Sequence, residues 1–390
     1  MKTKAHPSRT VLITGGRAPV ALEIARVFWR AGYRVISAEC LGHNLLTLSR
    51  STERNYLLSS PKLNFAEFKL QILKIVLIHN VTLIIPTCEE VFYIAQFKNE
   101  LPDTCTTYCP DFQTLRKLHS KFDFIEIAKK LNLNVPVSQR LKSTAQAKRI
   151  AERFGRLVLK PEYSRFGSRV HFISSQDRFP DLETSDSKAA SWVAQQYIPG
   201  KQISTYSTCQ AGKITAHCTY TSEYTLGPGS FIAFEALSHP NSLQWVETFV
   251  RNLNLTGQIA FDFIESSNDG KTYAIECNPR TTSGIHLLAS QKNISRCFTD
   301  FEPKISPNVG ERASSILAMA LYALTNIQDR GGSLRWLDTI IKSKDIIFSW
   351  QDPLPFLSQF LVLGKILIIA RRNNISVLEA STWDIEYNGS

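Results

Sequence analysis

Residues 258–264 read Gln-Ile-Ala-Phe-Asp-Phe-Ile and residues 272–280 read Thr-Tyr-Ala-Ile-Glu-Cys-Asn-Pro-Arg, with a turn of Ser, Asn, Asp and Gly between them. The pattern predicts two paired strands. Because alternate side chains of a strand share one face, Glu276 and Asn278 point the same way, and Asp262 can face them from the neighbouring strand. Oxygen ligands that leave room for water and phosphate suit Mg²⁺. We therefore expect a magnesium and phosphate site at this hairpin.

The composition is that of a globular enzyme. With 390 residues, of which 43% are hydrophobic and 20% charged, the chain is long enough for two or three packed units. The formal charge of +11 suits anionic partners, but the Lys and Arg residues are scattered and their one dense cluster, Arg371-Arg372, is short. Nucleic-acid binding requires a basic stripe with interleaved aromatic residues or a known module. We therefore expect no nucleic-acid partner, and a nucleotide substrate accounts for part of the charge.

Two further features bear on location. The eight cysteines include no CxxC pair, and the Lys-rich start does not read as a signal peptide, so we expect reduced thiols in a cytoplasmic protein. The most apolar C-terminal stretch, residues 356–370, is broken by Gln359 and Lys365 and falls short of the roughly 20 residues that cross a bilayer. We interpret it as a core helix without stable membrane insertion, with peripheral membrane contact as the alternative.

The first hundred residues alternate strand and helix signals. Residues 10–14 predict a buried strand, Gly15-Gly16 a turn, residues 19–31 a helix and residues 33–38 a second strand. This βαβ order, with a later strand at residues 81–85, predicts a Rossmann-like half-domain built on a parallel sheet.

The glycine turn raises the alternative of a dinucleotide site, with Glu39 reading the ribose. Residues 15–19 lack the Gly-x-Gly-x-x-Gly order that close approach to a pyrophosphate requires. We therefore favour a tight turn that feeds a helix, and an NAD(P)-dependent oxidoreductase is the less favoured function.

A new unit begins after Asp111. Residues 112–131 predict one or two helices that end before Pro136. Residues 157–161 predict an apolar strand with Lys160 near its end, followed by a polar loop. The other predicted elements are helices at 145–154 and 241–253 and strands at 170–173, 192–198 and up to about residue 220.

Three motifs follow one another in a set order: Lys160, the turn from Gln195 to Gly200, and the strand from Glu276 to Arg280. In this order they make the chain, over about residues 8–300, similar to the ATP-grasp superfamily. The resemblance is strongest to the branch that includes the large subunit of carbamoyl-phosphate synthase and the carboxylate–amine ligases.

The resemblance implies a combined α/β and α+β fold in three parts. A Rossmann-like pre-ATP-grasp domain would occupy residues 1–112, and a mainly helical region would occupy residues 306–390. Between them, residues 113–305 would form the two-lobed ATP-grasp fold, with lobes at about 113–192 and 193–305.

The resemblance also implies an ATP site. Lys121 and Lys160 would hold the phosphates, and Gln202 would hold the ribose at a position where relatives often carry Glu. A flap would cover the phosphates with fewer glycines than in many relatives, so the charge of Arg165 could compensate. The flap residues would be Ser164, Arg165 and Gly167, and the residues that read the adenine would be Gln195, Gln196, Tyr197 and Ile198.

The chemistry implied by the resemblance is phosphoryl transfer. Asp262, Glu276 and Asn278 would bind Mg²⁺ or Mn²⁺, and Arg280 would stabilise the transferred phosphoryl group or the acyl phosphate. His286 is a second catalytic candidate, although a lone histidine among apolar residues is more commonly structural.

The expected function is that of an ATP-dependent ligase that forms an amide from a small-molecule carboxylate and an amine. The alternative is a non-catalytic ATP-binding protein derived from a ligase. Glu89 or Glu90, at a strand's carboxyl end, is a candidate for holding the amine, although acidic residues also suit the first turn of a helix. The C-terminal helices cap the site or form the contact of a homodimer, and the sequence leaves both open.

Overall fold

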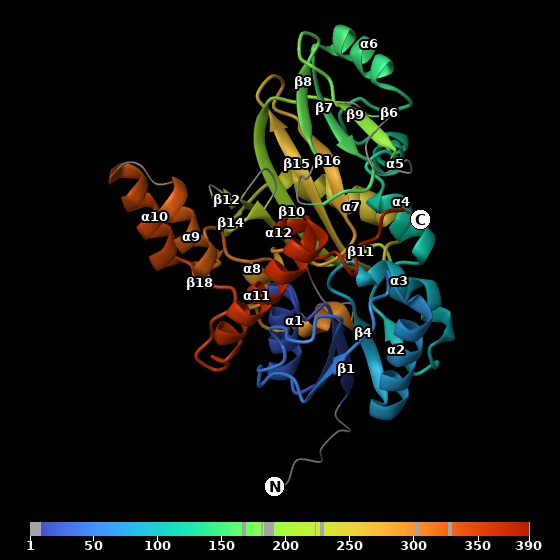
Figure 1. Ribbon diagram of the computed structural model, residues 1–390, viewed down its shortest axis with the longest axis vertical. Coiled ribbons are helices and arrows are strands. Elements are labelled where there is room, and N and C mark those ends of the chain that lie inside the picture. The colour runs from blue at the N-terminus through green and yellow to red at the C-terminus, as the bar shows by residue number, and fades with distance from the viewer. Residues whose placement is uncertain are drawn as a thin grey trace.

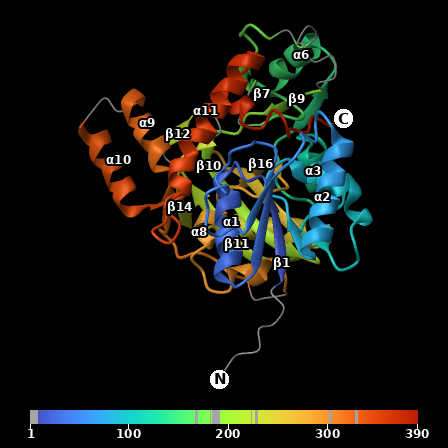
Figure 2. The ribbon, with the colours of Figure 1, turned by 60° about the horizontal axis from the view of Figure 1, so that its bottom comes forward.

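The structure is a computed structural model that describes residues 9–165, 169–180, 182, 191–222, 224–226, 230–300, 304–326 and 330–389. Three sheets follow one another along the long axis of the molecule, with the parallel sheet at the bottom of Figure 1 and the smallest antiparallel lobe at the top. The C-terminal helices lie along one side of this stack (Figures 1 and 2).

The parallel sheet is formed by the N-terminal part of the chain. Its strand order is β3-β2-β1-β4-β5, and β1 at its centre is buried along its whole length. The predicted βαβ unit is therefore present. The strands are β1 (Thr10–Thr14), β2 (Arg34–Glu39), β3 (Arg54–Leu57), β4 (Val81–Ile85) and β5 (Thr106–Thr107), and the helices are α1 (Pro19–Arg30), α2 (Phe65–His79) and α3 (Glu90–Phe97).

The turn after β1 requires glycine. Gly15 has a φ of +79°, and a Cβ at this position would lie 2.4 Å from Oγ1 of Thr87. The hydroxyl of Thr87 donates to the carbonyl oxygen of Thr14 at 2.7 Å, so the loop after β4 packs directly on this turn.

A four-stranded antiparallel sheet forms the small lobe. Its order is β6-β9-β7-β8, and helix α6 (Thr144–Phe154) packs on it through Ala147 and Ala151. Gly155 ends α6 with a φ of +77°, as the sequence pattern predicts. The strands are β6 (Ser138–Leu141), β7 (Arg156–Pro161), β8 (His171–Ser174) and β9 (Trp192–Gln196).

The large lobe is a seven-stranded sheet of order β16-β15-β10-β11-β14-β17-β18. Three helices pack against this lobe: α4 (Phe112–His119), α5 (Asp123–Lys130) and α7 (Pro240–Asn252). Trp245 of α7 stacks on Phe249 in the aromatic core of the lobe. The strands are β10 (Gly200–Gln210), β11 (Lys213–Thr221), β14 (Ala233–Leu237), β15 (Gly257–Ser266), β16 (Thr272–Asn278), β17 (Arg312–Ser314) and β18 (Lys344–Asp345). A two-stranded ladder, β12 (Thr225–Leu226) with β13 (Ser230–Phe231), lies beside it.

The C-terminal region is mainly helical, as expected, but it also extends the large sheet. Strands β17 and β18 pair in parallel beyond β14, so the sheet runs past residue 305. These two strands are too short to show an alternating apolar pattern, which is why the sequence did not indicate them. The helices are α9 (Ile316–Asn326), α10 (Arg330–Lys342), α11 (Pro355–Asn373) and α12 (Val377–Ala380).

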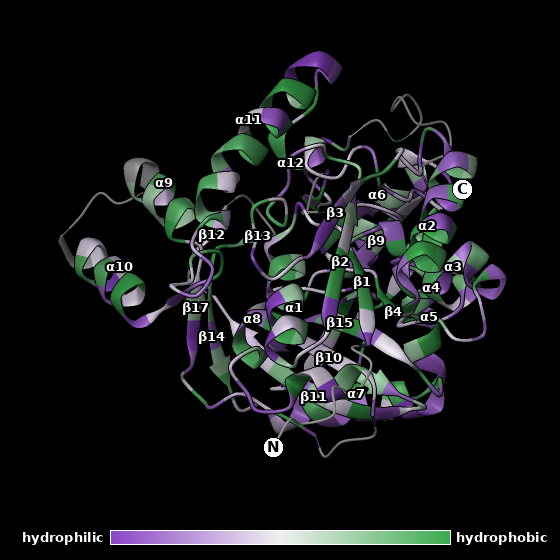
Figure 3. Ribbon diagram, turned by 90° about the horizontal axis from the view of Figure 1, so that it is seen from below, coloured by the Kyte–Doolittle hydropathy of each residue, from purple (hydrophilic) through white to green (hydrophobic). Residues whose placement is uncertain are grey.

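Helix α11 differs from the expected core helix. Leu357 and Phe360 are 58% and 49% exposed, and Ile368 is 51% exposed, while Val362 and Ala370 are buried. One face of α11 therefore packs on the protein and the other faces outward, where Figure 3 shows hydrophobic segments. None of the helices in the described part of the chain is long and apolar enough to span a membrane.

A buried ion pair fixes the segment before α11 to the parallel-sheet unit. The guanidinium of Arg26 lies 3.0 Å from Oδ2 of Asp352 and donates to the carbonyl oxygen of Ile347 at 2.8 Å. Asp352 also accepts from the hydroxyl of Ser49 at 2.6 Å. We expect Arg26→Ala to lower the free energy of unfolding by about 3 kcal/mol, because it leaves the Asp352 carboxylate buried without its cation.

Equilibrium unfolding in urea measures this loss. Arg54→Ala is the matched control, since Arg54 is exposed on β3. A change of less than about 1 kcal/mol in Arg26→Ala would show that the pair contributes no more than a surface ion pair.

Candidate active site

A cavity of about 630 Å³ lies between the two antiparallel lobes and the parallel sheet. One end is polar and carries the side chains of β15, β16 and the segment after them. The other end is largely apolar and is lined by Val158, Val170, Phe172, Ile198, Ile264 and Ile275.

The three expected metal ligands meet at the polar end. Asp262 on β15 is directly opposite Glu276 on β16, and the ladder shifts register just after Asp262. Asn278 donates its amide to Oδ2 of Asp262 at 3.3 Å, and the hydroxyl of Ser204 donates to Oδ1 at 2.5 Å. Two carboxylates and one amide oxygen therefore face the same space.

The two carboxylates differ in pKa. Burial and the neighbouring Glu276 raise the pKa of Asp262 to about 6. Burial acts on Glu276 in the same direction, but the ammonium groups of Lys121 and Lys160 outweigh it and lower the pKa of Glu276. Repulsion between two carboxylates on one face is what a divalent cation relieves, so this donor set fits Mg²⁺.

The two predicted phosphate-binding lysines have different positions. Nζ of Lys160 donates to Oε1 of Gln195 and to the carbonyl oxygen of Ile275, both at 3.0 Å. Nζ of Lys121 lies 3.3 Å from Oε1 of Glu276 and donates to the carbonyl oxygen of Ser164 at 2.7 Å. Among the described residues, those lining the cavity include Lys160 but not Lys121. Lys121 therefore pairs with Glu276 without lining the cavity.

The end of β9, the turn after it and the start of β10 also line the cavity. The residues expected to contact adenine and ribose all border the cavity: Gln195, Gln196, Tyr197, Ile198 and Gln202. A Cβ on Gly200 would lie 2.0 Å from the carbonyl oxygen of Glu265, so only glycine permits this close pairing of β10 with β15.

Residues 118–284 match the ATP-grasp domain family, and they hold the lysines, the carboxylate pair and the segment after β9. The chain contains an ATP-grasp domain. No curated protein resembles it closely enough in sequence to count as a match.

Solved structures share the fold at low identity. N5-carboxyaminoimidazole synthetase from Staphylococcus aureus, complexed with ADP, is 16% identical with a TM-score of 0.64, covering 82% of this chain and 85% of that chain. The biotin carboxylase domain of 2-oxoglutarate carboxylase from Hydrogenobacter thermophilus, in complex with MgADP and bicarbonate, is 15% identical with a TM-score of 0.61. The match covers 79% of this chain and 74% of that chain. L-amino acid ligase from Bacillus licheniformis is 16% identical with a TM-score of 0.58, covering 76% of this chain and 75% of that chain. The predicted fold class, a parallel first sheet followed by two antiparallel lobes, is confirmed.

The flap of this ATP-grasp domain differs from expectation. Ser164 donates to the carbonyl oxygen of Pro161 at 3.4 Å, and Gly167 lies outside the described residues. Arg165 is not a free cation for phosphate, because all three of its guanidinium nitrogens are engaged. They pair with Glu89, with Glu386 at 2.8 Å and with the carbonyl oxygen of Tyr387 at 2.9 Å.

His286, expected as a catalytic candidate, is not among the described residues that line the cavity. It is buried in the short helix α8 (Ile285–Leu288), and its Nδ1 lies 3.1 Å from Oε2 of Glu23 on α1. Of the described residues that line the cavity, the nearest in sequence is Ser283. The structure therefore gives His286 a packing role between the ATP-grasp domain and the parallel sheet.

The two glutamates after β4, Glu89 and Glu90, make different contacts. Glu89 lines the cavity and accepts from the backbone N–H of Tyr387 at 3.0 Å. Glu90 accepts from the hydroxyl of Thr14 at 2.7 Å and from the N–H groups of Thr87 and Cys88, so it holds the loop together. Glu90 is thus not free to hold an amine.

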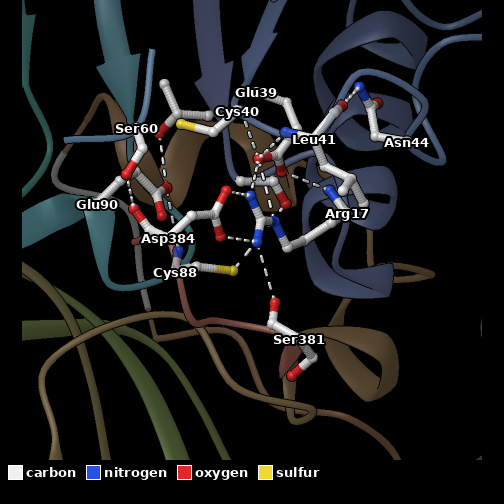
Figure 4. A network of polar contacts seen from close by, with 12 residues as sticks. Arg17, Glu39, Cys40, Leu41, Asn44, Ser60, Cys88, Glu90, Ser381 and Asp384 are labelled. Carbon is white, nitrogen blue, oxygen red and sulfur yellow. Dashed lines mark hydrogen bonds and ion pairs between the residues drawn. The ribbon is translucent and has the colours of Figure 1, made fainter. Parts of the chain in front are cut away.

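Glu39 is likewise not free to read a ribose. Its carboxylate accepts from the backbone N–H of Arg17 at 2.8 Å, from the Arg17 guanidinium and from the N–H groups of Cys40 and Leu41 (Figure 4). With Gly15 and Gly16 serving a tight turn, the expected dinucleotide alternative loses its ribose acceptor.

The charge of Lys160 predicts a pH dependence of nucleotide binding. Desolvation lowers its pKa to about 8, and the nearby Lys121 adds to the effect while Glu276 opposes it. We expect the affinity for MgATP to fall about tenfold between pH 7 and pH 9, because a neutral amine no longer attracts phosphate. The same shift stabilises the fold as the pH rises through 8, since the unfolded chain keeps this proton longer.

Isothermal titration with MgATP at several pH values checks this. Lys160→Arg keeps its charge throughout the range and should remove most of the decline above pH 8. An equal decline in both proteins would assign the titration to another group.

Proposed function

We propose that the chain is an ATP- and magnesium-dependent ligase that activates a carboxylate as an acyl phosphate and transfers it to an amine. The observation that supports this most directly is the polar end of the cavity. It places the Asp262 and Glu276 carboxylates, the Lys160 ammonium and the Arg280 guanidinium around one space. In this proposal residues 1–112, 113–305 and 306–390 act as three units around that space.

Arg280 is the group best suited to bind the acid. It donates to Oδ1 of Asn278 and to the carbonyl oxygen of Thr281, both at 3.3 Å, and forms no salt bridge with any acidic residue in the described part of the chain. A guanidinium without an acidic partner attracts an oxyanion. The other arginines of the cavity, Arg17 and Arg165, are each shared between two carboxylates.

The proposed reaction has two steps. A carboxylate oxygen attacks the γ-phosphorus of ATP and ADP leaves, with Lys160 and Arg280 offsetting the charge on the phosphoryl oxygens. The amine nitrogen then attacks the acyl carbon. The bond between that carbon and the bridging oxygen breaks, inorganic phosphate leaves, and the nitrogen loses a proton to solvent. Mg²⁺ held by Asp262, Glu276 and the Asn278 amide would neutralise phosphate charge.

Two other outcomes have structural support. The similar structures include carboxylases as well as an amino acid ligase, so bicarbonate is a second acid to test. Gln202 at the ribose position and the engaged state of Arg165 favour an ATP-binding protein without turnover.

An ADP-release screen of carboxylic acids crossed with amines, including bicarbonate, separates these outcomes when products are identified by mass spectrometry. We expect ADP release that requires one acid and rises with one amine. Thermal shift with MgATP but no release with any pair would favour the non-catalytic protein. Stabilisation by NADPH and not by MgATP would overturn the proposal.

A further inference from the structure

The last residues of the chain form a wall of the cavity. We name residues 381–389 the C-terminal strap. After α12 the strap runs from the middle of the molecule toward α3 and α4 (Figure 1). Ser381 and Thr382 line the same cavity as Thr282 and Ser283, so the strap forms part of the wall around the space where the proposed acid would bind.

The first half of the strap is held by the parallel sheet. Nη2 of Arg17 lies 2.8 Å from Oδ2 of Asp384 and 2.6 Å from Oε1 of Glu39 (Figure 4). Arg17 also donates to the carbonyl oxygen of Ser381 at 3.1 Å, and Ser60 donates to that of Asp384 at 2.5 Å. The Arg17 side chain is only 4% exposed, so these contacts are shielded from solvent.

The second half of the strap is held by the small lobe and α3. Glu386 and the carbonyl oxygen of Tyr387 bind Arg165, and the N–H of Tyr387 donates to Glu89. The Tyr387 ring stacks on Phe92 with centroids 4.8 Å apart. Arg165 is the last described residue before the loop that would cover the phosphates.

The two arginines that bind the strap also pair with acids of the N-terminal unit. Arg17 keeps Glu39, and Arg165 keeps Glu89, if the strap is removed. Neither arginine would then be a lone buried charge, so what the fold loses with the strap is chiefly the packing of the buried Tyr387 ring on Phe92. The strap instead fixes where the Arg165 guanidinium points and closes the cavity.

We propose that the C-terminal strap completes the substrate side of the active site. Ser381 and Thr382 contact the acid substrate and select for its shape, and Glu386 is a positioning residue that acts through Arg165. The inference rests on the proposed function, and it adds that MgATP binding and strap docking favour each other. This coupling must be reciprocal.

The test uses a protein truncated after Ala380 and a fluorescent peptide of residues 381–390. The peptide should bind the truncated protein, and saturating MgATP should tighten binding by about tenfold. A peptide with Asp384→Asn and Glu386→Gln is the matched control and should bind at least about tenfold more weakly. Equal peptide affinity with and without MgATP would overturn the coupling.

Turnover gives the second measurement. The truncated protein should bind MgATP about tenfold more weakly than the full chain, as reciprocal coupling requires, and the KM for the acid should rise at least about tenfold. The peptide should restore the KM, and Glu386→Gln in the full chain should raise the KM with little change in unfolding temperature. If the truncated protein does not fold, the Glu386→Gln variant of the full chain tests the inference. An unchanged KM for the acid in that variant would overturn it.

The two hypotheses fail differently. A full chain without MgATP affinity contradicts the proposed function. A full chain that binds and turns over MgATP, with a truncated form of equal KM, contradicts only the strap.

Discussion

Replacing Glu276 by Gln should lower acid- and amine-dependent ADP release by about 1,000-fold. The change keeps the size of the side chain but removes the charge opposite Asp262, so the hairpin offers one carboxylate to the metal where it now offers two. It also leaves the Lys121 ammonium without the carboxylate 3.3 Å away. Coupled detection of ADP measures the loss.

Two comparisons make this result specific. Glu265→Gln changes a half-exposed carboxylate on the same strand as Asp262 and should retain full turnover. Circular dichroism of Glu276→Gln at the assay temperature should match that of the unsubstituted protein. Turnover within about threefold of the unsubstituted protein would exclude Glu276 from metal binding.

Replacing Arg280 by Ala should lower kcat by about 100-fold while the affinity for MgATP changes little. Arg280 follows the hairpin of β15 and β16 and has no acidic partner among the described residues, so its charge would be available to the proposed acid and to the transferred phosphoryl group. Interactions made mainly in the transition state affect kcat more than binding. Steady-state kinetics and isothermal titration separate the two effects.

The conservative variant sharpens the assignment. Arg280→Lys keeps the charge but loses the forked geometry, so it should recover only part of the rate. Arg251→Ala, on the exposed face of α7, is the control for the loss of a positive charge. An Arg280→Ala protein with reduced MgATP affinity and normal kcat would place Arg280 at the nucleotide instead.

Local patterns predicted the frame of the site well. The glycine turn after β1 and the paired strands β15 and β16 follow from composition and alternation within short windows. Asp262, Glu276 and Asn278 come together because strand register sets which side chains face each other. These features depend on neighbours along the chain, which a single sequence displays directly.

Features that depend on distant partners were not predictable. Arg165 was expected at the phosphates, but its partners Glu386 and Tyr387 lie more than 220 residues further along the chain. His286 was a catalytic candidate until Glu23, 263 residues away, gave it a buried partner. Nothing in the local sequence marks such pairs, because tertiary packing alone brings them together.

The exposed face of α11 illustrates a related limit. The apolar residues of α11 indicate a helix that packs against the rest of the protein. The sequence does not show how many of its faces are buried. Leu357 and Phe360 are exposed, while Val362 is buried against the parallel-sheet unit. A homodimer contact through this helix stays a prediction.

The position of the strap also has a consequence for synthesis in the cell. Asp384 must find Arg17, 367 residues earlier, so this wall of the cavity can form only after residues 381–387 have left the ribosome. The sheets that carry the other walls are complete before that point. A stop codon at position 381 would therefore leave the residues of all three sheets in the product and remove one wall of the cavity.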